Sequence, residues 1–364
     1  MKLTDIQASG RVLGLDFIRI SLAILIYAFH SSIHFSCNYY WLDDFVRLGA
    51  IAMTAFFILS GYSLHLSSSR RDLTKAGEIK QFYIKRLITI LPLYYFVALT
   101  SVILDLSFGR DTLEQVAVLF PVELFATQSS FTTLFYHSHN GGTWFISCLL
   151  ICYLAYPFIQ SLFQQLSVRS KVMSLLLLSA ILFYAPFIQH YFHLNSVSVY
   201  TSPFYRLIEF IIGVIIAQIN TSGLENKFLT IVRKPYSWAI SSVLLILGLT
   251  MGRRFGLPDD YMLYNIVVVP CFIVIIMSSG SMKFESIKNP AFILYLSKLS
   301  FAFFLCQTLP LWAVSRHLCR WAGMESNILR ILLSFAVCLV GAVLLHHFVE
   351  KPSGAFLKKK FLRQ

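Results

Sequence analysis

Apolar segments of about 20 residues recur from one end of this sequence to the other, and this pattern limits the fold more than any other feature. A bilayer's hydrocarbon core is about 30 Å thick and needs about 20 apolar residues of helix to cross it. Hydrophobic residues fill 57% of the 364 positions and charged residues only 13%, whereas soluble domains carry about 25% charged residues. We therefore predict an all-α, polytopic integral membrane protein with about ten transmembrane helices. The expected spans are 13–34, 46–66, 83–104, 143–163, 172–190, 204–219, 236–251, 262–278, 291–313 and 328–349.

The segments between these spans are short, so we expect one membrane domain over 1–364 with no soluble domain appended. The stretch 113–128 is apolar but is interrupted by Pro121 and Glu123, which is typical of a re-entrant or interfacial piece rather than another span. The first span contains charged residues and lacks a small-residue cleavage site, so we interpret it as a retained anchor and not a signal peptide.

The loop charges give the spans a direction. Lysine and arginine accumulate on the cytoplasmic side of membrane proteins. Twenty of them lie in the termini and in the loops that share a side with the termini, six of these between residues 67 and 86, whereas the alternate loops hold six. We therefore predict that both termini are cytoplasmic. The same bias accounts for the net charge of +13, so no nucleic-acid partner is expected.

The seven cysteines do not form a disulfide framework or a metal site. Five of them lie inside apolar segments, where a thiol packs as a small hydrophobic group. Cys37 and Cys319 lie in loops, and no cysteine or histidine cluster has the spacing of metal ligands. We expect no metal ion.

Ionisable residues lie in the first span, among them Asp16, Arg19 and His30, and each costs roughly 3 kcal/mol or more unless it is paired or hydrated. Asp16 and Arg19 are three residues apart and can pair on one helical face. His30 follows Arg19 by eleven residues, which places it on nearly the same face about 16 Å further along the axis. This geometry suits a long anionic donor that enters from the cytoplasm, with His30 as the general base near the outer side. The structural alternative is that Asp16 and Arg19 fix helix packing and that His30 bonds a backbone carbonyl.

Other charged residues allow two interpretations each. Arg86, beside Lys85 at the start of the third span, can bind phosphates or can anchor the helix at the cytoplasmic surface. Arg206 and Glu209 are three residues apart, as in a structural ion pair or a substrate contact. Glu350 precedes a proline, and we expect it to cap the end of the last span. The stretch 105–142 is rich in hydroxyl, histidine and aromatic residues, which suits a pocket wall that faces a polar ligand.

Motifs spread over most of the chain resemble the acyltransferase family 3 membrane proteins, which acylate cell-surface glycans in bacteria. The most specific match is the first span, in which the family's basic residue and histidine stand as Arg19 and His30. The matching segments are LGLDFIRISLAILIYAFH at 13–30, AFFILSGYSL at 55–64, FYIKRLITILP at 82–92, GTWFISCLLICYLAYP at 142–157, RLIEFIIGVIIA at 206–217, LSKLSFAFFLCQTLP at 296–310 and FVEKP at 348–352.

The resemblance implies an inner-membrane enzyme that transfers an acyl group, usually acetyl, from cytoplasmic acyl-CoA to a hydroxyl of a surface polysaccharide or its lipid-linked precursor. It implies that His30 is the essential base, that Arg19 positions the donor or the helix, and that Arg86 helps to hold the CoA. We expect direct transfer, because no serine stands out as a nucleophile. Polysaccharide-assembly proteins or a second copy of the chain are the expected partners. The full set of expected site residues is His30 as catalytic, Arg19, Arg86, Lys85 and Asp16 toward the donor, and Ser60, Tyr62, His139, Trp144, Arg206 and Glu209 as channel or acceptor contacts.

The chain departs from the family pattern at several places. Thr89 stands where a second arginine is common, residues 146–148 read Ile-Ser-Cys, and Gln307 replaces a usual histidine. The competing hypothesis is a transporter or flippase for a glycan. We favour the acyltransferase because no internal repeat is evident and because the 67–86 loop offers a basic entry on one side only. The transferred acyl group can be succinyl instead of acetyl, and the sequence leaves both alternatives open.

Overall fold

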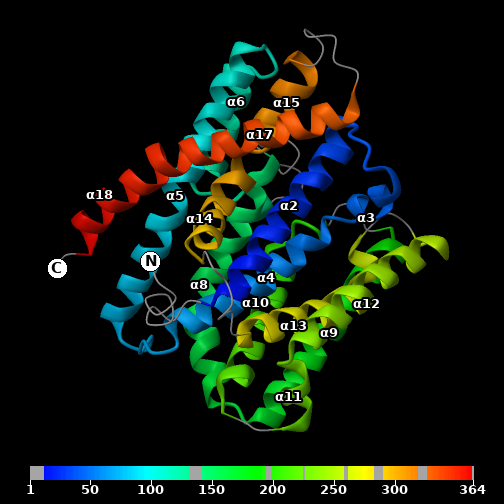
Figure 1. Ribbon diagram of the computed structural model, residues 1–364. Helices are drawn as coiled ribbons and strands as arrows, with labels where there is room; N and C mark the ends of the chain where they lie inside the picture. Colours follow the sequence, from blue (N-terminus) through cyan, green and yellow to red (C-terminus); the bar gives the residue numbers. More distant parts are fainter. Residues whose placement is uncertain are drawn as a thin grey trace.

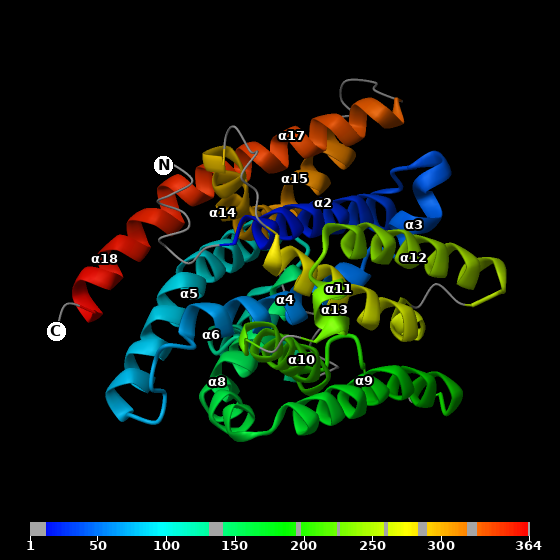
Figure 2. The same ribbon diagram turned by 60° about the horizontal axis from the view of Figure 1, so that its bottom comes forward.

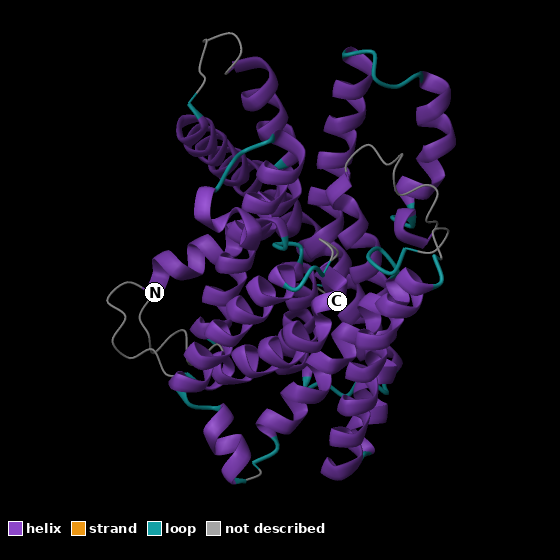
Figure 3. Cartoon of the chain, turned by 90° about the vertical axis from the view of Figure 1, so that its right-hand side faces the viewer, coloured by secondary structure: helices purple, strands orange, loops and turns teal. Residues whose placement is uncertain are grey.

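In this computed structural model, the structure describes residues 12–130, 141–193, 198–223, 226–257, 261–282, 290–318 and 326–362. Every regular element within these ranges is a helix (Figure 3), which confirms the predicted all-α class. The long helices are α2 (Leu13–Phe35), α4 (Ile51–Ser68), α5 (Ala76–Ser107), α8 (Trp144–Gln165), α9 (Val168–Tyr191), α10 (Pro203–Thr221), α12 (Pro235–Arg254), α13 (Asn265–Ser281), α14 (Pro290–Cys306) and α17 (Asn327–Leu345).

Nine helices in the described part of the chain are long and apolar enough to cross a membrane. Among the ten expected spans, 291–313 does not form a single long helix, and that prediction is wrong. It divides into α14, the short helix α15 (Thr308–Trp312) and a π-helical turn at Ala313–Leu318, with Gln307 at the break. Pro310 explains the division, because it has no N–H to donate to the carbonyl of Cys306 one turn earlier.

The last span also differs from its expected end. Instead of stopping before the proline, the helix continues through a π-helical turn (His346–Glu350) into α18 (Lys351–Phe361). The wider turn accommodates Pro352, which cannot donate to the Phe348 carbonyl. The expectation that Glu350 caps a helix end is therefore wrong. Figure 1 shows α17 and α18 as one long helix, and Figure 2 shows that it lies at the edge of the molecule.

The interrupted apolar stretch 113–128 does not form another span. It contains α6 (Leu113–Leu124), which starts with a capping box in which Thr112 and Gln115 bond each other's backbone N–H groups. Its 12 residues extend over about 18 Å, which is too short to cross the hydrocarbon core.

Helices α4 and α10 lie in the middle of the bundle (Figures 1 and 2) and pack closely against each other. Gly61 of α4 lies against the Phe210 carbonyl oxygen, and Gly213 of α10 lies against the Ile58 carbonyl oxygen. A methyl group at either glycine would overlap the facing carbonyl oxygen. Glycine at these two positions therefore allows the two helix backbones to touch. In the outer helices α9, α12 and α17, most apolar side chains are partly or fully exposed, as contact with lipid requires.

Candidate functional site

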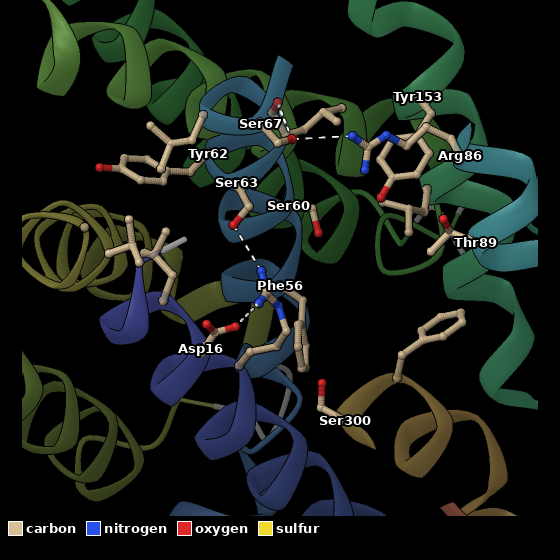
Figure 4. A pocket seen from close by; sticks show the side chains of 18 of the residues that line it. Asp16, Phe56, Ser60, Tyr62, Ser63, Ser67, Arg86, Thr89, Tyr153 and Ser300 are labelled. Atoms are coloured by element: carbon tan, nitrogen blue, oxygen red, sulfur yellow. Dashed lines mark hydrogen bonds and ion pairs between the residues drawn. The ribbon is translucent and has the colours of Figure 1, made fainter. Parts of the chain in front are cut away.

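A cavity of about 1260 Å³ opens between the ends of several helices. Its lining comes from α2, α4, α5, α8, α10, α13, α14 and the turn before α18 (Figure 4). The loops that join α4 to α5 and α10 to α12 lie at this end, and both belong to the basic set that the sequence assigns to the cytoplasm. The orientation stays a prediction, and under it the cavity opens to the cytoplasm.

The predicted pair in the first span is formed at the wall of this cavity. Arg19 Nη1 lies 2.9 Å from Asp16 Oδ1, and Arg19 Nη2 donates to Ser63 Oγ of α4 at 3.1 Å. Ser297 of α14 donates to Asp16 Oδ1 at 2.6 Å. The Asp16 side chain is only 2% exposed, whereas that of Arg19 is 29% exposed. The pair therefore ties α2 to α4 and α14 and leaves one part of the guanidinium facing the cavity.

Arg86 brings a second cation to the cavity. Because α5 begins at Ala76, Arg86 lies inside the helix and not in the loop before it. Its Nη2 donates to Ser67 Oγ at 3.4 Å (Figure 4), and its guanidinium lies 5.7 Å from the ring centroid of Tyr153. Its Nε is buried and has no hydrogen-bond partner in the described part of the chain. Arg86 can therefore offer an N–H group and a positive charge to a ligand.

A face of hydroxyl groups completes the polar wall. Ser60, Ser63 and Ser67 follow the helical period along one face of α4, and all three line the cavity. The sequence reasoning singled out only Ser60, although the spacing of the three serines in the second span was a readable signal. Thr89, which replaces a second arginine, donates to the Lys85 carbonyl at 2.8 Å and also lines the cavity.

Three phenylalanine rings, which we call the aromatic layer, lie together at the cavity wall. Phe56 of α4, Phe145 of α8 and Phe304 of α14 all line the cavity, with ring centroids 5.3 to 6.3 Å apart. No single span contains this layer, so the sequence reasoning missed it.

His30 lies outside the lining of this cavity, toward the opposite end of α2. Its ring centroid is 5.6 Å from that of His34 and 5.5 Å from that of Phe29. Its Nδ1 is buried and has no hydrogen-bond partner in the described ranges. This nitrogen therefore does not make the backbone bond that the structural alternative supposed.

Arg206 and Glu209 form a closed ion pair, and both side chains are 0% exposed. Arg206 Nη1 lies 2.8 Å from both Glu209 oxygens, and Thr54 Oγ1 donates to Glu209 Oε1 at 2.8 Å. The rings of Trp144 and Tyr200 lie 5.5 and 5.3 Å from the guanidinium. None of these residues lines the cavity. The arrangement favours the structural interpretation of the pair.

The expected site residues therefore divide into two groups. Asp16, Arg19, Ser60, Tyr62 and Arg86 line one cavity. His30, Lys85, Trp144, Arg206 and Glu209 do not line it, and His139 lies outside the described residues. Among the described residues, no group of three or more histidine, cysteine, aspartate or glutamate side chains has the arrangement of a metal site.

The fold and the cavity define a polytopic membrane protein with a basic, hydroxyl-lined site at one end. The family described as Acyltransferase domain matches residues 12–347. The chain belongs to this family, the acyltransferase family 3 that its motifs resemble. It is also similar to acyltransferase MdmB of Streptomyces mycarofaciens, with 23% identity over 336 residues that cover 86% of this chain and 83% of the relative. No solved structure matches. The protein is a multi-pass membrane acyltransferase.

The structural interpretation of the closed ion pair is testable by removing one partner. We expect Glu209→Ala to cost about 3–5 kcal/mol of stability, because it leaves the Arg206 charge buried and unpaired. Thermal unfolding in detergent measures this, with Arg47→Ala as the control, since Arg47 forms a half-exposed pair with Asp43. A Glu209→Ala protein that unfolds at the wild-type temperature but loses transfer activity would identify a substrate contact instead.

Proposed function

We propose that the protein is an O-acyltransferase of the bacterial cytoplasmic membrane. In this proposal it moves an acetyl group from cytoplasmic acetyl-CoA to a hydroxyl of a cell-surface polysaccharide or its lipid-linked precursor. The observation that carries the proposal is the one-sided cavity, in which Arg86 and Arg19 face an open space on the side of the basic loops. Polysaccharide-assembly proteins or a second copy of the chain are the partners that fit this role.

The cavity supports a large anionic donor. Its volume of about 1260 Å³ exceeds the roughly 300–1,000 Å³ of typical small-molecule pockets. CoA carries several phosphate groups, which arginine side chains bind through paired N–H groups. Arg70 and Arg86 both line the cavity and Arg70 is the more exposed of the two, so cations line the path that the phosphates would take. The serine face of α4 supplies hydroxyl donors between them.

The chemistry assigned to His30 is general-base catalysis. A neutral imidazole takes the proton of the acceptor hydroxyl as its oxygen attacks the thioester carbonyl. The new C–O bond forms and the C–S bond breaks, after which the imidazolium returns the proton to the leaving thiolate. Thioester and alcohol thus become ester and thiol without a metal ion or a covalent enzyme intermediate. The unpartnered Nδ1 of His30 supports this role, because no neighbour in the described part of the chain holds it in a structural bond.

The base is tested by removing its imidazole. We expect His30→Ala to abolish acetylation of the surface glycan while protein abundance stays at the wild-type level. Mass spectrometry of surface polysaccharide from complemented deletion strains measures the acetyl content and also identifies the acceptor. His34→Ala is the matched control, because this neighbouring ring is more exposed and we expect it to leave acetylation intact. Undiminished acetylation in the His30 variant would refute the assignment.

The donor site is tested by removing its cations. We expect Arg19→Ala and Arg86→Ala each to weaken acetyl-CoA binding about 10- to 100-fold, which corresponds to the loss of a charge-assisted hydrogen bond. Calorimetry on the purified protein measures the dissociation constant. Arg71→Ala serves as the control, since Arg71 lies 3.8 Å from Glu78 and does not line the cavity. Equal affinity in wild type and both cavity variants would contradict the donor site.

A further inference from the structure

Gln307 has a buried amide group that the fold does not use. Its side chain is 0% exposed, and neither Oε1 nor Nε2 has a hydrogen-bond partner in the described residues. Its backbone carbonyl is occupied, since it accepts from Leu311 N and Cys338 Sγ. Leaving a buried polar group unsatisfied costs about 1–3 kcal/mol. A group kept at that cost is a candidate for binding a ligand.

The position of Gln307 supports the same conclusion. It lies at the break between α14 and α15, where Pro310 interrupts the expected ninth span. Broken transmembrane helices are found where backbone lines a site inside the protein rather than lipid.

Gln307 lies at the level of His30 in the bundle. Helices α2 and α14 run in the same direction, because Arg19 contacts Ser297 near their starts and Tyr27 contacts Phe303 further along, with ring centroids 5.8 Å apart. His30 follows Tyr27 by three residues, and Gln307 follows Phe303 by four. Each is therefore one helical turn beyond the same contact.

The aromatic layer separates this level from the donor cavity. Phe304 lines the cavity, and Gln307 follows it by three residues without lining the cavity. Gln307 therefore stands just beyond the layer on the helix that borders the donor, whereas His30 stands on α2.

We propose that Gln307 is a catalytic residue whose Nε2–H donates a hydrogen bond to the acyl carbonyl oxygen. This inference rests on the proposed function. When the acceptor oxygen attacks the thioester carbon, negative charge develops on the carbonyl oxygen, and a fixed N–H donor stabilises it. His30 takes the proton of the acceptor hydroxyl, and Gln307 stabilises the charge on the acyl carbonyl oxygen in the same step. Amide nitrogen supplies the donor, and no proton leaves Gln307 during the reaction.

The test replaces Gln307 by an apolar residue of similar length. We expect Gln307→Met to lower kcat about 100- to 1000-fold, the usual effect of losing one such donor, while the acetyl-CoA dissociation constant stays unchanged. Gln218→Met is the matched control, because Gln218 is also buried with both amide atoms unpartnered and does not line the cavity. Both variants should unfold at or above the wild-type temperature, since each loses a buried unsatisfied amide.

A second variant tests whether the side chain at position 307 acts as a hydrogen-bond donor or as an acceptor. Gln307→Glu keeps the shape, but at alkaline pH its carboxylate only accepts hydrogen bonds, and we expect kcat to fall as far as in Gln307→Met. Wild-type kcat in Gln307→Met, or in Gln307→Glu, would overturn the inference. The proposed function fails separately, if the wild-type protein transfers no acetyl group from acetyl-CoA.

Discussion

A charged side chain inside the bilayer must be paired or hydrated, and this requirement organises the protein. Arg206 meets it fully, because Glu209 and surrounding groups enclose its guanidinium. Arg19 meets it through Asp16 and Ser63, and its side chain is 29% exposed at the cavity wall. Arg86 has only a serine hydroxyl as a side-chain hydrogen-bond partner in the described part of the chain. Arg206 is thus enclosed within the bundle, whereas Arg19 and Arg86 lie at the wall of the cavity, where an anion can approach them.

The polar groups of the proposed site lie at different positions along the helices. The cations and serines lie at the end that the loop charges assign to the cytoplasm, and the aromatic layer lines the same cavity, whereas His30 does not. His30 Nδ1 and the amide group of Gln307 are buried and have no hydrogen-bond partner in the described part of the chain. In the function that we propose, the anionic body of the donor stays on one side while only its small acyl end meets an acceptor on the other. The bilayer then excludes bulk water from the reacting atoms.

Features that depend on local periodicity were predictable from sequence. The apolar segments placed nine spans, and the three-residue spacing of Asp16 and Arg19 predicted their pair. Features that depend on several helices were not predictable. The aromatic layer joins three distant spans, and the same spacing at Arg206 fitted both a structural and a substrate role until packing enclosed it. Pro310 and Pro352 were visible, but proline alone does not say whether a helix breaks or continues through a π turn.

The central claim is that the donor enters the cavity from the basic end alone. Ser60 lines the cavity, so Ser60→Cys in an otherwise cysteine-free chain reports access to it. A membrane-impermeant maleimide should label this cysteine in inside-out vesicles and not in right-side-out vesicles, and acetyl-CoA should slow the labelling. Labelling from the outer side, or labelling at an equal rate with and without acetyl-CoA, would contradict the account.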